Sequence, residues 1–222
     1  MLSIDDFEII KIDCLVNFGF KPSIMDKRFQ FVEEFAQEFP EISYTELPPM
    51  LSVRSAGGER SITIRADRWE YSSRSLESIE DFADQVIDYL RRFCEITQIK
   101  EFEGIGLRVN YNHLLESVQC SPPEFPYLKD FFDIPGIEDE RIADLIHYNV
   151  SVQRAGKRFA LTLGQFREKE IYFLRPILEL YEFHSLGLDN VKDKLIDFYR
   201  SLVKGFERYL KKNNERSCPN VE

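Results

Sequence analysis

The 222-residue sequence has 29 Lys and Arg against 39 Asp and Glu, and its net charge of −10 excludes a surface that coats nucleic acid uniformly. Ten Gly and ten Pro are too few for a disordered or fibrous chain, and no apolar run approaches the roughly 20 residues that cross a bilayer. The four cysteines lack metal-ligand spacing and the acidic N-terminus does not resemble a signal peptide. We therefore expect a cytoplasmic protein without membrane contact and without a cofactor.

The charge is distributed unequally along the chain. Residues 1–146 hold 15 Lys and Arg against 29 Asp and Glu, whereas residues 147–222 hold 14 against 10. The two balances are therefore −14 and +4. This asymmetry predicts either two faces with different partners or two lobes that attract each other, unless helix surfaces merely differ in composition.

The first elements are a strand, a helix and a hairpin. Branched and aromatic residues predict a strand over residues 7–20. Asp26 is the candidate cap of a following helix. The apolar residues at helical spacing in this helix are Phe29, Val32, Ala36 and Phe39. Residues 51–64 then predict two strands around a turn at Gly57-Gly58.

A second helix starts at Ser78-Ile-Glu-Asp81, which resembles a capping box with Asp in place of Glu. Its predicted buried stripe is Ile79, Phe82, Val86, Leu90 and Phe93. The strand containing residues 104–113 comes next. Four prolines then make residues 117–136 the best candidate for a connector.

The second half repeats part of the first. Residues 151–163 align without a gap on residues 52–64, and the aligned pairs include Ser52 with Ser151 and Gly57 with Gly156. A strand near 171–183 and a long amphipathic helix from about 190 to 212 follow. The apolar stripe of this helix is Val191, Leu195, Phe198, Leu202, Phe206 and Tyr209. The pattern predicts an internal repeat, although Ala-Gly turns are common enough for coincidence.

These elements predict an α+β fold of two related lobes, each a mainly antiparallel sheet with amphipathic helices on one face. The predicted boundaries are an N-terminal lobe at 1–116, a proline-rich connector at 117–136 and a C-terminal lobe at 137–222. The C-terminal lobe contains the second hairpin and the long terminal helix.

The stretch "GIGLRVNYNH", residues 104–113, admits three interpretations. A dinucleotide loop is excluded, because a third glycine is missing and a helix precedes the stretch instead of following it. The spacing of Arg108 and His113 occurs in helical ribonucleases of the HEPN type, but the alternating pattern here is that of a strand, on which the two would point to opposite faces. We therefore predict a half-buried strand whose polar face carries Arg108, Asn110 and Asn112.

This strand and its surroundings resemble a sporadically distributed prokaryotic family of uncharacterised proteins of about this length. The resemblance rests on "LPPMLSVRSAGGERSITIRADRWEYS", on "FEGIGLRVNYNHLLE" and on "YLKDFFDIPG", in this order. Residues 105–108 match the family's strand, whereas Val109 replaces the usual Tyr and "LELYEF" replaces a frequent D-x-D. The resemblance implies membership but no activity, substrate or cofactor.

Candidate catalytic and metal-binding residues are few. His113, His147 and His184 lie near predicted strand ends, but none has a second ligand at the usual spacing, so no metal site is predicted. Glu179 and Glu182 point to opposite faces of a strand and cannot act as a pair. No nucleophile elbow, P-loop or Cys–His arrangement is present in the sequence.

Basic residues beside aromatic ones on the two hairpins suit phosphate contact and base stacking. The candidate nucleic-acid-binding residues are Arg54, Arg60, Arg65, Arg68, Trp69, Arg108, Arg154, Lys157 and Arg158. The alternative is a pair of solvated hairpins held by cross-strand ion pairs.

Together these observations favour a non-enzymatic binding or adaptor subunit whose partner is another protein. One alternative is a nucleic-acid-binding accessory subunit of a prokaryotic defence complex, for example the N-terminal half of a split Argonaute. The other is a cryptic phosphodiesterase that uses Arg108, His113 and Glu179.

Overall fold

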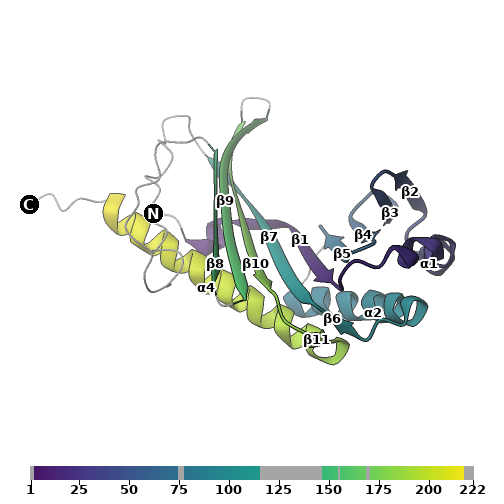
Figure 1. Cartoon of the computed structure of the whole chain (residues 1–222). Coiled ribbons are helices and arrows are strands. Elements are labelled where there is room, and N and C mark those ends of the chain that lie inside the picture. The colour runs from purple at the N-terminus through teal and green to yellow at the C-terminus, as the bar shows by residue number, and fades with distance from the viewer. Residues whose placement is uncertain (1–2, 75–77, 116–146, 155, 169–170, 218–222) are drawn as a thin grey trace, which may run out of the picture.

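Nine antiparallel strands form one sheet that contains residues of both halves of the chain (Figure 1). The computed structural model describes residues 3–74, 78–115, 147–154, 156–168 and 171–217. From one edge to the other the order is β2, β3, β4, β5, β1, β7, β10, β9 and β8. Their bounds are β1 Glu8–Asn17, β2 Glu41–Glu46, β3 Pro49–Arg54, β4 Arg60–Arg65, β5 Arg68–Ser73, β7 Gly104–Leu115, β8 His147–Arg154, β9 Lys157–Glu168 and β10 Ile171–Glu182. The short strands β6 (Glu101–Phe102) and β11 (Leu186–Gly187) pair separately.

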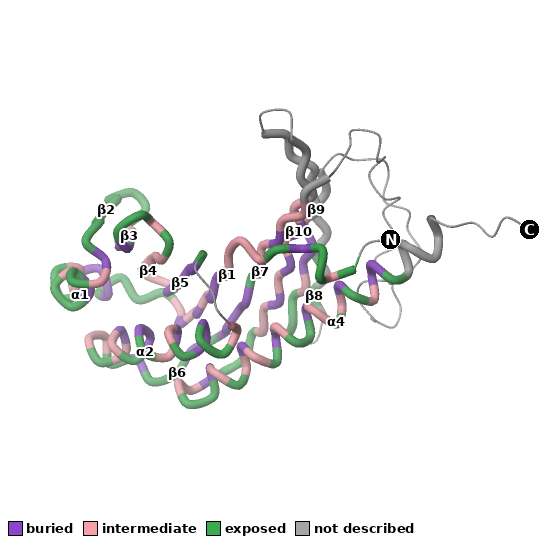
Figure 2. The backbone as a smooth tube through the Cα atoms, turned by 180° about the vertical axis from the view of Figure 1, so that it is seen from behind, coloured by how far each residue is buried: buried purple, intermediate pink, exposed green. Residues whose placement is uncertain are grey.

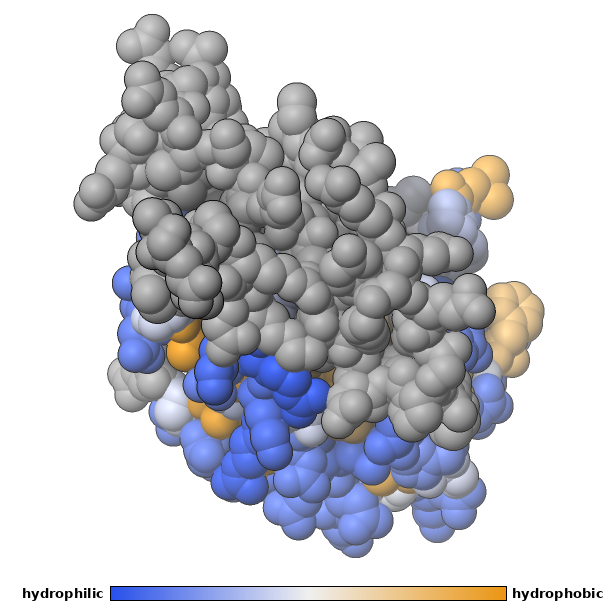
Figure 3. Space-filling view, turned by 90° about the vertical axis from the view of Figure 1, so that its left-hand side faces the viewer, coloured by the Kyte–Doolittle hydropathy of each residue, from blue (hydrophilic) through white to orange (hydrophobic). Residues whose placement is uncertain are grey.

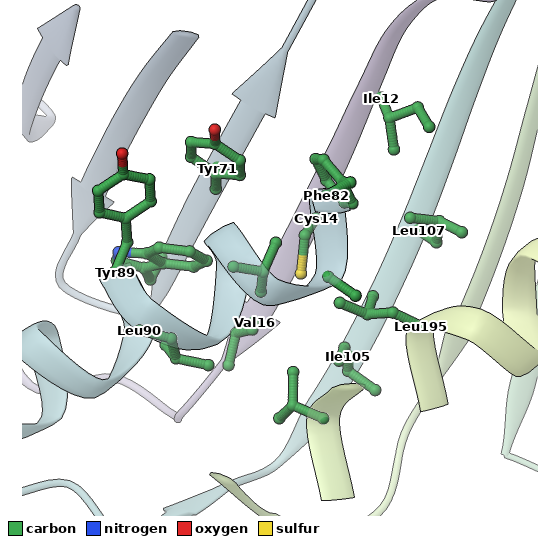
Figure 4. Close-up of a cluster of buried hydrophobic side chains, with 14 of the residues drawn as sticks. Ile12, Cys14, Val16, Tyr71, Phe82, Tyr89, Leu90, Ile105, Leu107 and Leu195 are labelled. Carbon is green, nitrogen blue, oxygen red and sulfur yellow. The ribbon is translucent and has the colours of Figure 1, made fainter. Parts of the chain in front are cut away.

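Three α-helices among the described residues cover one face of this sheet, and none of these described helices lies on the opposite face (Figures 1 and 2). They are α1 (Arg28–Phe35), α2 (Ile79–Thr97) and α4 (Val191–Ser217), and the short 3-10 turns η1 (Ile4–Asp6), η2 (Pro22–Lys27) and η3 (Leu188–Asn190) flank α4 and α1. The core lies between helices and sheet. Figure 4 shows side chains of β1, β5, β7, α2 and α4 meeting there, among them Cys14, Tyr71 and Leu195.

The α+β class is confirmed, but the division into two lobes is not. β7 of the first half pairs with β10 of the second half, from Ile105 opposite Glu182 to Leu115 opposite Tyr172. A single buried cluster includes residues from both halves, such as Phe82 of α2 and Phe206 of α4. The predicted connector at 117–136 lies outside the described residues, and the domain boundaries stay predictions.

The two long helices have the apolar faces that their sequences predict. The Ser78 hydroxyl caps α2 by accepting a hydrogen bond from the Asp81 backbone N–H at 3.0 Å. Of the predicted stripe of α2, only Ile79 is partly rather than fully buried. All six predicted stripe residues of α4 are buried. No described helix is long and apolar enough to span a membrane.

The prediction for the face of the first helix was partly wrong: Phe39 is buried and Val32 packs against the core, whereas Ala36 is exposed. Phe29 is exposed, and the buried residues are Phe31, Phe35 and Phe39, which follow one another at steps of four. The 3-10 turn η2 takes up Asp26, so α1 begins at Arg28 with Lys27 as its cap residue, one residue later than a helix capped by Asp26. Phe31 and Phe35 lie four residues apart on the side of α1 that packs against Phe93 and Tyr89 of α2.

The two hairpins differ in their turns. β3 and β4 are joined by five residues, in which Gly57 and Gly58 both have positive φ, whereas β8 and β9 are joined by two residues, of which Gly156 has φ +76°. Ser52 consequently pairs with Thr63, but its aligned counterpart Ser151 pairs with Ala160. The registers are therefore not equivalent, and the internal repeat stays a prediction. β2 and β5 were not anticipated from the sequence.

Candidate binding site on the open face of the sheet

The uncovered face of the sheet carries a row of charged side chains across its central strands. On β1, Ile12, Cys14 and Val16 point into the core, so the alternating residues Lys11 and Asp13 belong to the other face, here called the open face. The same alternation puts Arg108 and Asn110 of β7 on the open face. The prediction of a half-buried strand over residues 104–113 is thus confirmed.

Asp13 is the centre of this row and is almost completely buried, with 4% of its side chain exposed. Lys11 Nζ lies 2.6 Å from Asp13 Oδ1, and the hydroxyl of Ser72 on β5 donates to the same oxygen. Asn110 Nδ2 donates to Asp13 Oδ2 at 3.3 Å, and Arg108 NH1 lies 4.0 Å from that oxygen. A buried carboxylate with this many donors fixes the position of the cations around it.

Arg108 connects Asp13 to the next strands. Its Nε donates to Glu179 Oε1 of β10 at 2.6 Å, and Arg158 NH2 of β9 lies 3.8 Å from Glu179 Oε2. Burial lowers the pKa of Arg108, but the charge of Glu179 and its hydrogen bond raise that pKa more, so the net shift is upward. The guanidinium is therefore charged at every physiological pH.

A pocket of about 290 Å³ opens above this row. Arg68 and Glu70 of β5 form one wall, Arg158 and Phe183 line the other side, and β1 and β7 provide the floor. Its charged lining residues are Asp13, Glu70, Glu179, Arg68, Arg108 and Arg158, three of each sign. The pocket is therefore highly charged but formally neutral.

Of the two glycines of "GIGLRVNYNH", Gly106 lines the floor of this pocket, and both lie under the ring of Tyr181. The ring of Tyr181 on β10 lies across β7, so that a Cβ on Gly106 would meet Tyr181 Cδ2 at 2.4 Å and one on Gly104 would meet the Tyr181 hydroxyl at 2.7 Å. Tyr181 also packs on Phe183, with ring centroids 4.4 Å apart. Glycine is required here because an aromatic ring occupies the place of its side chain.

A second hollow continues the open face toward the first hairpin. It measures about 540 Å³, and its lining includes Lys11, Arg54 and Arg74 together with Glu41 and Glu59. Lys11 lines this hollow, and Asp13 on the same strand lines the pocket. The hollow and the pocket therefore form one continuous strip along β1, in which positive and negative side chains alternate. Figure 3 gives a different side view, in which the described surface is mostly hydrophilic.

The nine predicted nucleic-acid-binding residues divide between the two faces. Arg54, Arg68, Arg108 and Arg158 line the two hollows of the open face, and the register of β4 puts Arg65 on the same face. Arg60 and Lys157 face the helices, where Arg60 NH1 donates to Tyr89 Oη at 3.1 Å and Lys157 Nζ lies 3.8 Å from Glu182 Oε1. Arg154 pairs with Lys157 in the ladder, and its side chain lies outside the described residues.

Trp69 does not lie on either surface. Its side chain is completely buried, and its ring stacks on Tyr71, which in turn contacts Phe82 of α2. The sequence interpretation grouped Trp69 with Arg68 because they are neighbours, but neighbours on a strand point to opposite faces. A base cannot reach the indole while the protein is folded, so the base-stacking role is withdrawn.

The three residues of the phosphodiesterase hypothesis are not brought together. Arg108 and Glu179 are in contact on the open face, whereas His113 contacts Phe7 at a ring distance of 4.9 Å and its Nδ1 lies 2.7 Å from the Asp6 carbonyl oxygen. His184 Nδ1 lies 3.2 Å from Glu182 Oε1, and the side chain of His147 lies outside the described residues. The described part of the chain contains no group of three metal-ligating side chains.

Sequence reasoning missed Asp13, Glu70 and Tyr181. Asp13 carried a signal, because it is the one acid inside the apolar run "IIKIDCLVNF" and a strand in that position must either bury it or expose it. Nothing in the local sequence indicated the role of Tyr181, because its contact with Gly106 depends on strand pairing between residues 75 positions apart.

Comparisons with known proteins leave the function open. No family model and no curated protein matches the chain, so the resemblance to an uncharacterised prokaryotic family stays a prediction. Among solved structures, DynU16 from the dynemicin biosynthetic locus is 10% identical over 90% of this chain and 98% of its own, with a TM-score of 0.27. TTHA0849 from Thermus thermophilus is 11% identical over 91% and 98%, with a TM-score of 0.20. Likenesses this weak support no inference.

Proposed function

We propose that this protein is a non-enzymatic binding or adaptor subunit that contacts a protein partner through the open face of its sheet. The observation that carries the proposal is the neutral pocket, in which arginines and carboxylates alternate over β5, β1, β7, β10 and β9. A partner segment with acidic and basic residues in the complementary order can exchange ion pairs with Arg108 and Glu179. Such complementarity supplies specificity and register more than affinity.

Two further features suit a protein partner. Arg108 and Arg158 are about half exposed, so a partner can reach them without a rearrangement of the buried Asp13. Leu15 and the exposed ring of Phe183 line the same pocket and provide apolar contact area beside the charges. Interfaces commonly combine an aromatic or arginine anchor with a polar rim.

The alternative is a nucleic-acid-binding accessory subunit of a prokaryotic defence complex, such as the N-terminal half of a split Argonaute. It is favoured by the presence of five of the predicted arginines on one face. It is opposed by the carboxylates among them, because Asp13, Glu70 and Glu179 repel phosphates, and Asp13 and Glu179 already pair with Arg108 and Arg158. The protein-partner proposal therefore has the stronger support.

The test is charge reversal across the contact between Arg108 and Glu179. Full-length protein, Arg108→Glu and Glu179→Arg are used to capture partners from native extract, and the bound proteins are quantified. The matched control exchanges the exposed pair Lys192 and Asp84, which joins α4 to α2 on the helix side. We expect each open-face variant to lose its partner at least tenfold while the control retains it. Equal capture by all variants, or no reproducible partner, overturns the proposal.

Fluorescence anisotropy with short DNA and RNA between about 50 and 200 mM salt distinguishes nucleic-acid binding from binding to a protein partner. Four to six phosphate contacts give a slope of log K against log salt of roughly −4 to −5 on duplex DNA. The protein-partner proposal expects a slope near zero. A steep slope that is lost in Arg158→Ala supports nucleic-acid binding instead.

A further inference from the structure

The edge strand β2 is exposed along its whole length. All six residues from Glu41 to Glu46 are exposed, and among the described strands β2 is hydrogen-bonded to β3 alone. The ladder between β2 and β3 is continuous from Glu41 opposite Arg54 to Glu46 opposite Pro49, without a bulge. Within the described part of the chain, the outer side of β2 therefore presents regular, unpaired backbone groups at one end of the sheet (Figure 1).

As far as the structure describes the chain, this edge lacks the usual protection against pairing. Natural edge strands are commonly blocked by an inward-pointing Lys, a Pro, a bulge or a covering loop. The sequence "EISYTE" contains no Lys, no Pro and no Gly, and its acids stand only at the two ends. β2 is thus suited to accept another strand.

One face of β2 also carries exposed apolar side chains. Ile42 and Tyr44 pair with the buried residues Val53 and Leu51, so they continue the core face of the sheet, yet they are 46% and 42% exposed. The guanidinium of Arg28 lies 4.7 Å from the ring centre of Phe29, which is 70% exposed, and 5.5 Å from that of Tyr44. The core face therefore extends to the edge of the sheet, where its last apolar side chains are half exposed.

We propose that β2 pairs antiparallel with β2 of a second copy of this chain, about a two-fold axis at Ser43. In this register Ser43 faces Ser43, Ile42 faces Tyr44 and Glu41 faces Thr45. Opposite residues lie on the same face of an antiparallel ladder, so the two Ile–Tyr pairs join the apolar faces of both copies. No acid faces an acid within the ladder.

The self-complementary order of the side chains is the reason for choosing a second copy as the occupant. A two-fold interface requires that every residue find a suitable partner in the same short segment, and Ile42 with Tyr44 and Glu41 with Thr45 meet this requirement. The same register brings the turn at Leu47, which is 89% exposed, beside the start of the other copy's strand after Pro40. This surface is separate from the pocket around Arg108, although Glu41 also lines the second hollow of the open face, and the inference does not depend on the proposed partner.

Charge sets the expected strength and salt dependence of the pairing. Each copy has a net charge of −10, so two copies repel each other at low ionic strength. Salt screens this repulsion, because the Debye length falls from about 14 Å to about 6 Å between roughly 50 and 300 mM. Dimerisation should therefore become stronger as salt is added.

The first test is sedimentation equilibrium of the full-length protein at these two salt concentrations. We expect a monomer–dimer equilibrium that tightens with salt and weakens at least tenfold in Ile42→Lys and in Tyr44→Lys. Phe183→Lys is the matched control, because Phe183 is equally exposed but lines the open-face pocket. Circular dichroism and thermal melting establish that every variant is folded.

The second test fixes the register. Directly opposite residues of antiparallel strands have Cα atoms about 4.5–5.5 Å apart, within the range that a disulfide spans. In a background with Cys120 and Cys218 changed to Ser, we expect Ser43→Cys to form a disulfide-linked dimer on mild oxidation. Thr45→Cys should not, because it faces Glu41.

A monomer at all concentrations, or a dimer that Ile42→Lys leaves unchanged, overturns the inference. Crosslinking of Thr45→Cys but not of Ser43→Cys overturns the register. If the protein stays monomeric and Ile42→Lys loses a captured protein, the occupant of β2 is a different chain. Loss of dimer with retained open-face capture affects this inference alone, whereas loss of capture in Arg108→Glu with a retained dimer affects only the proposed function.

Discussion

Replacement of Gly106 by Ala tests the packing of Tyr181 across β7. The new Cβ would lie 2.4 Å from Tyr181 Cδ2, so the ring has to shift, although it packs on Phe183 with a distance of 4.4 Å between ring centres. Overpacking of this kind costs about 1–3 kcal/mol. The loss of glycine's freedom in the unfolded chain offsets about 0.4–1 kcal/mol of that cost. We expect a net destabilisation of about 1–2 kcal/mol, or roughly 2–8 °C in Tm for a chain of this size.

The measurement is urea denaturation followed by circular dichroism, with Gly187→Ala as the matched control. Gly187 has φ −86°, and a Cβ built there meets nothing within 4 Å, so its free energy of unfolding should change by less than about 0.5 kcal/mol. A Tyr181→Ala background removes the obstructing ring, and in that background Gly106→Ala should cost clearly less. The reasoning is refuted if Gly106→Ala is as stable as the wild type, or if its cost is the same in both backgrounds.

Three further predictions concern single groups. Burial, together with the charges of Glu70 and Asp13, raises the pKa of the Cys14 thiol, and burial together with the charge of Glu95 raises the pKa of the Cys94 thiol to about 11. Peptide mapping after alkylation of the native protein at pH 8 should therefore find Cys14 unmodified until the protein unfolds, and Cys94 modified only slowly. Burial raises the pKa of Glu38, but hydrogen bonds from Arg92 and Tyr89 lower it more, so the ionised carboxylate stabilises the fold above the unfolded-state pKa and this stabilisation is lost as pH falls through the folded-state pKa. Urea titrations should therefore show that Glu38→Gln is less stable than the wild type at pH 7 but not at pH 3. The sole tryptophan, Trp69, should emit as a buried indole and show no quenching by added oligonucleotide, and quenching by a bound strand would contradict its place in the core.

The sequence anticipates those elements whose periodicity is carried by consecutive residues. Ser78 with Asp81 locates the start of α2, and the apolar steps of α4 identify its buried face from Val191 to Tyr209, because both signals depend on residues within one or two turns. The strand at 104–115 is predictable for the same reason. The face of α1 was only partly predictable, since the 3-10 turn η2, which delays the start of the helix by one residue, leaves little trace in composition.

The candidate site was predictable only in part. Arg108 could be assigned to a polar strand face from the sequence, and Glu179 to one face of a later strand. Their contact requires the pairing of β7 with β10, which depends on a register between distant segments that no local pattern specifies. The division of the hairpin cations between two faces, in contrast, follows from strand alternation alone, because the neighbours Arg158 and Lys157 must point to opposite faces.

The strand order has a consequence for how the chain is synthesised. β1, β5 and β7 leave the ribosome long before β10 and α4, which lie beside β7 in the finished sheet. Until then, Tyr111 of β7 lacks its contact with Phe206, and the edge of β7 that pairs with β10 has no neighbour. Phe7 near the N-terminus is synthesised early but packs on Phe206 of the final helix, with a distance of 5.1 Å between ring centres, so it stays without this contact for most of translation. Nascent chains therefore expose apolar side chains and an unpaired strand edge of an incomplete sheet for much of translation. A holdase chaperone should bind ribosome-stalled chains that end before residue 190 far better than the released protein.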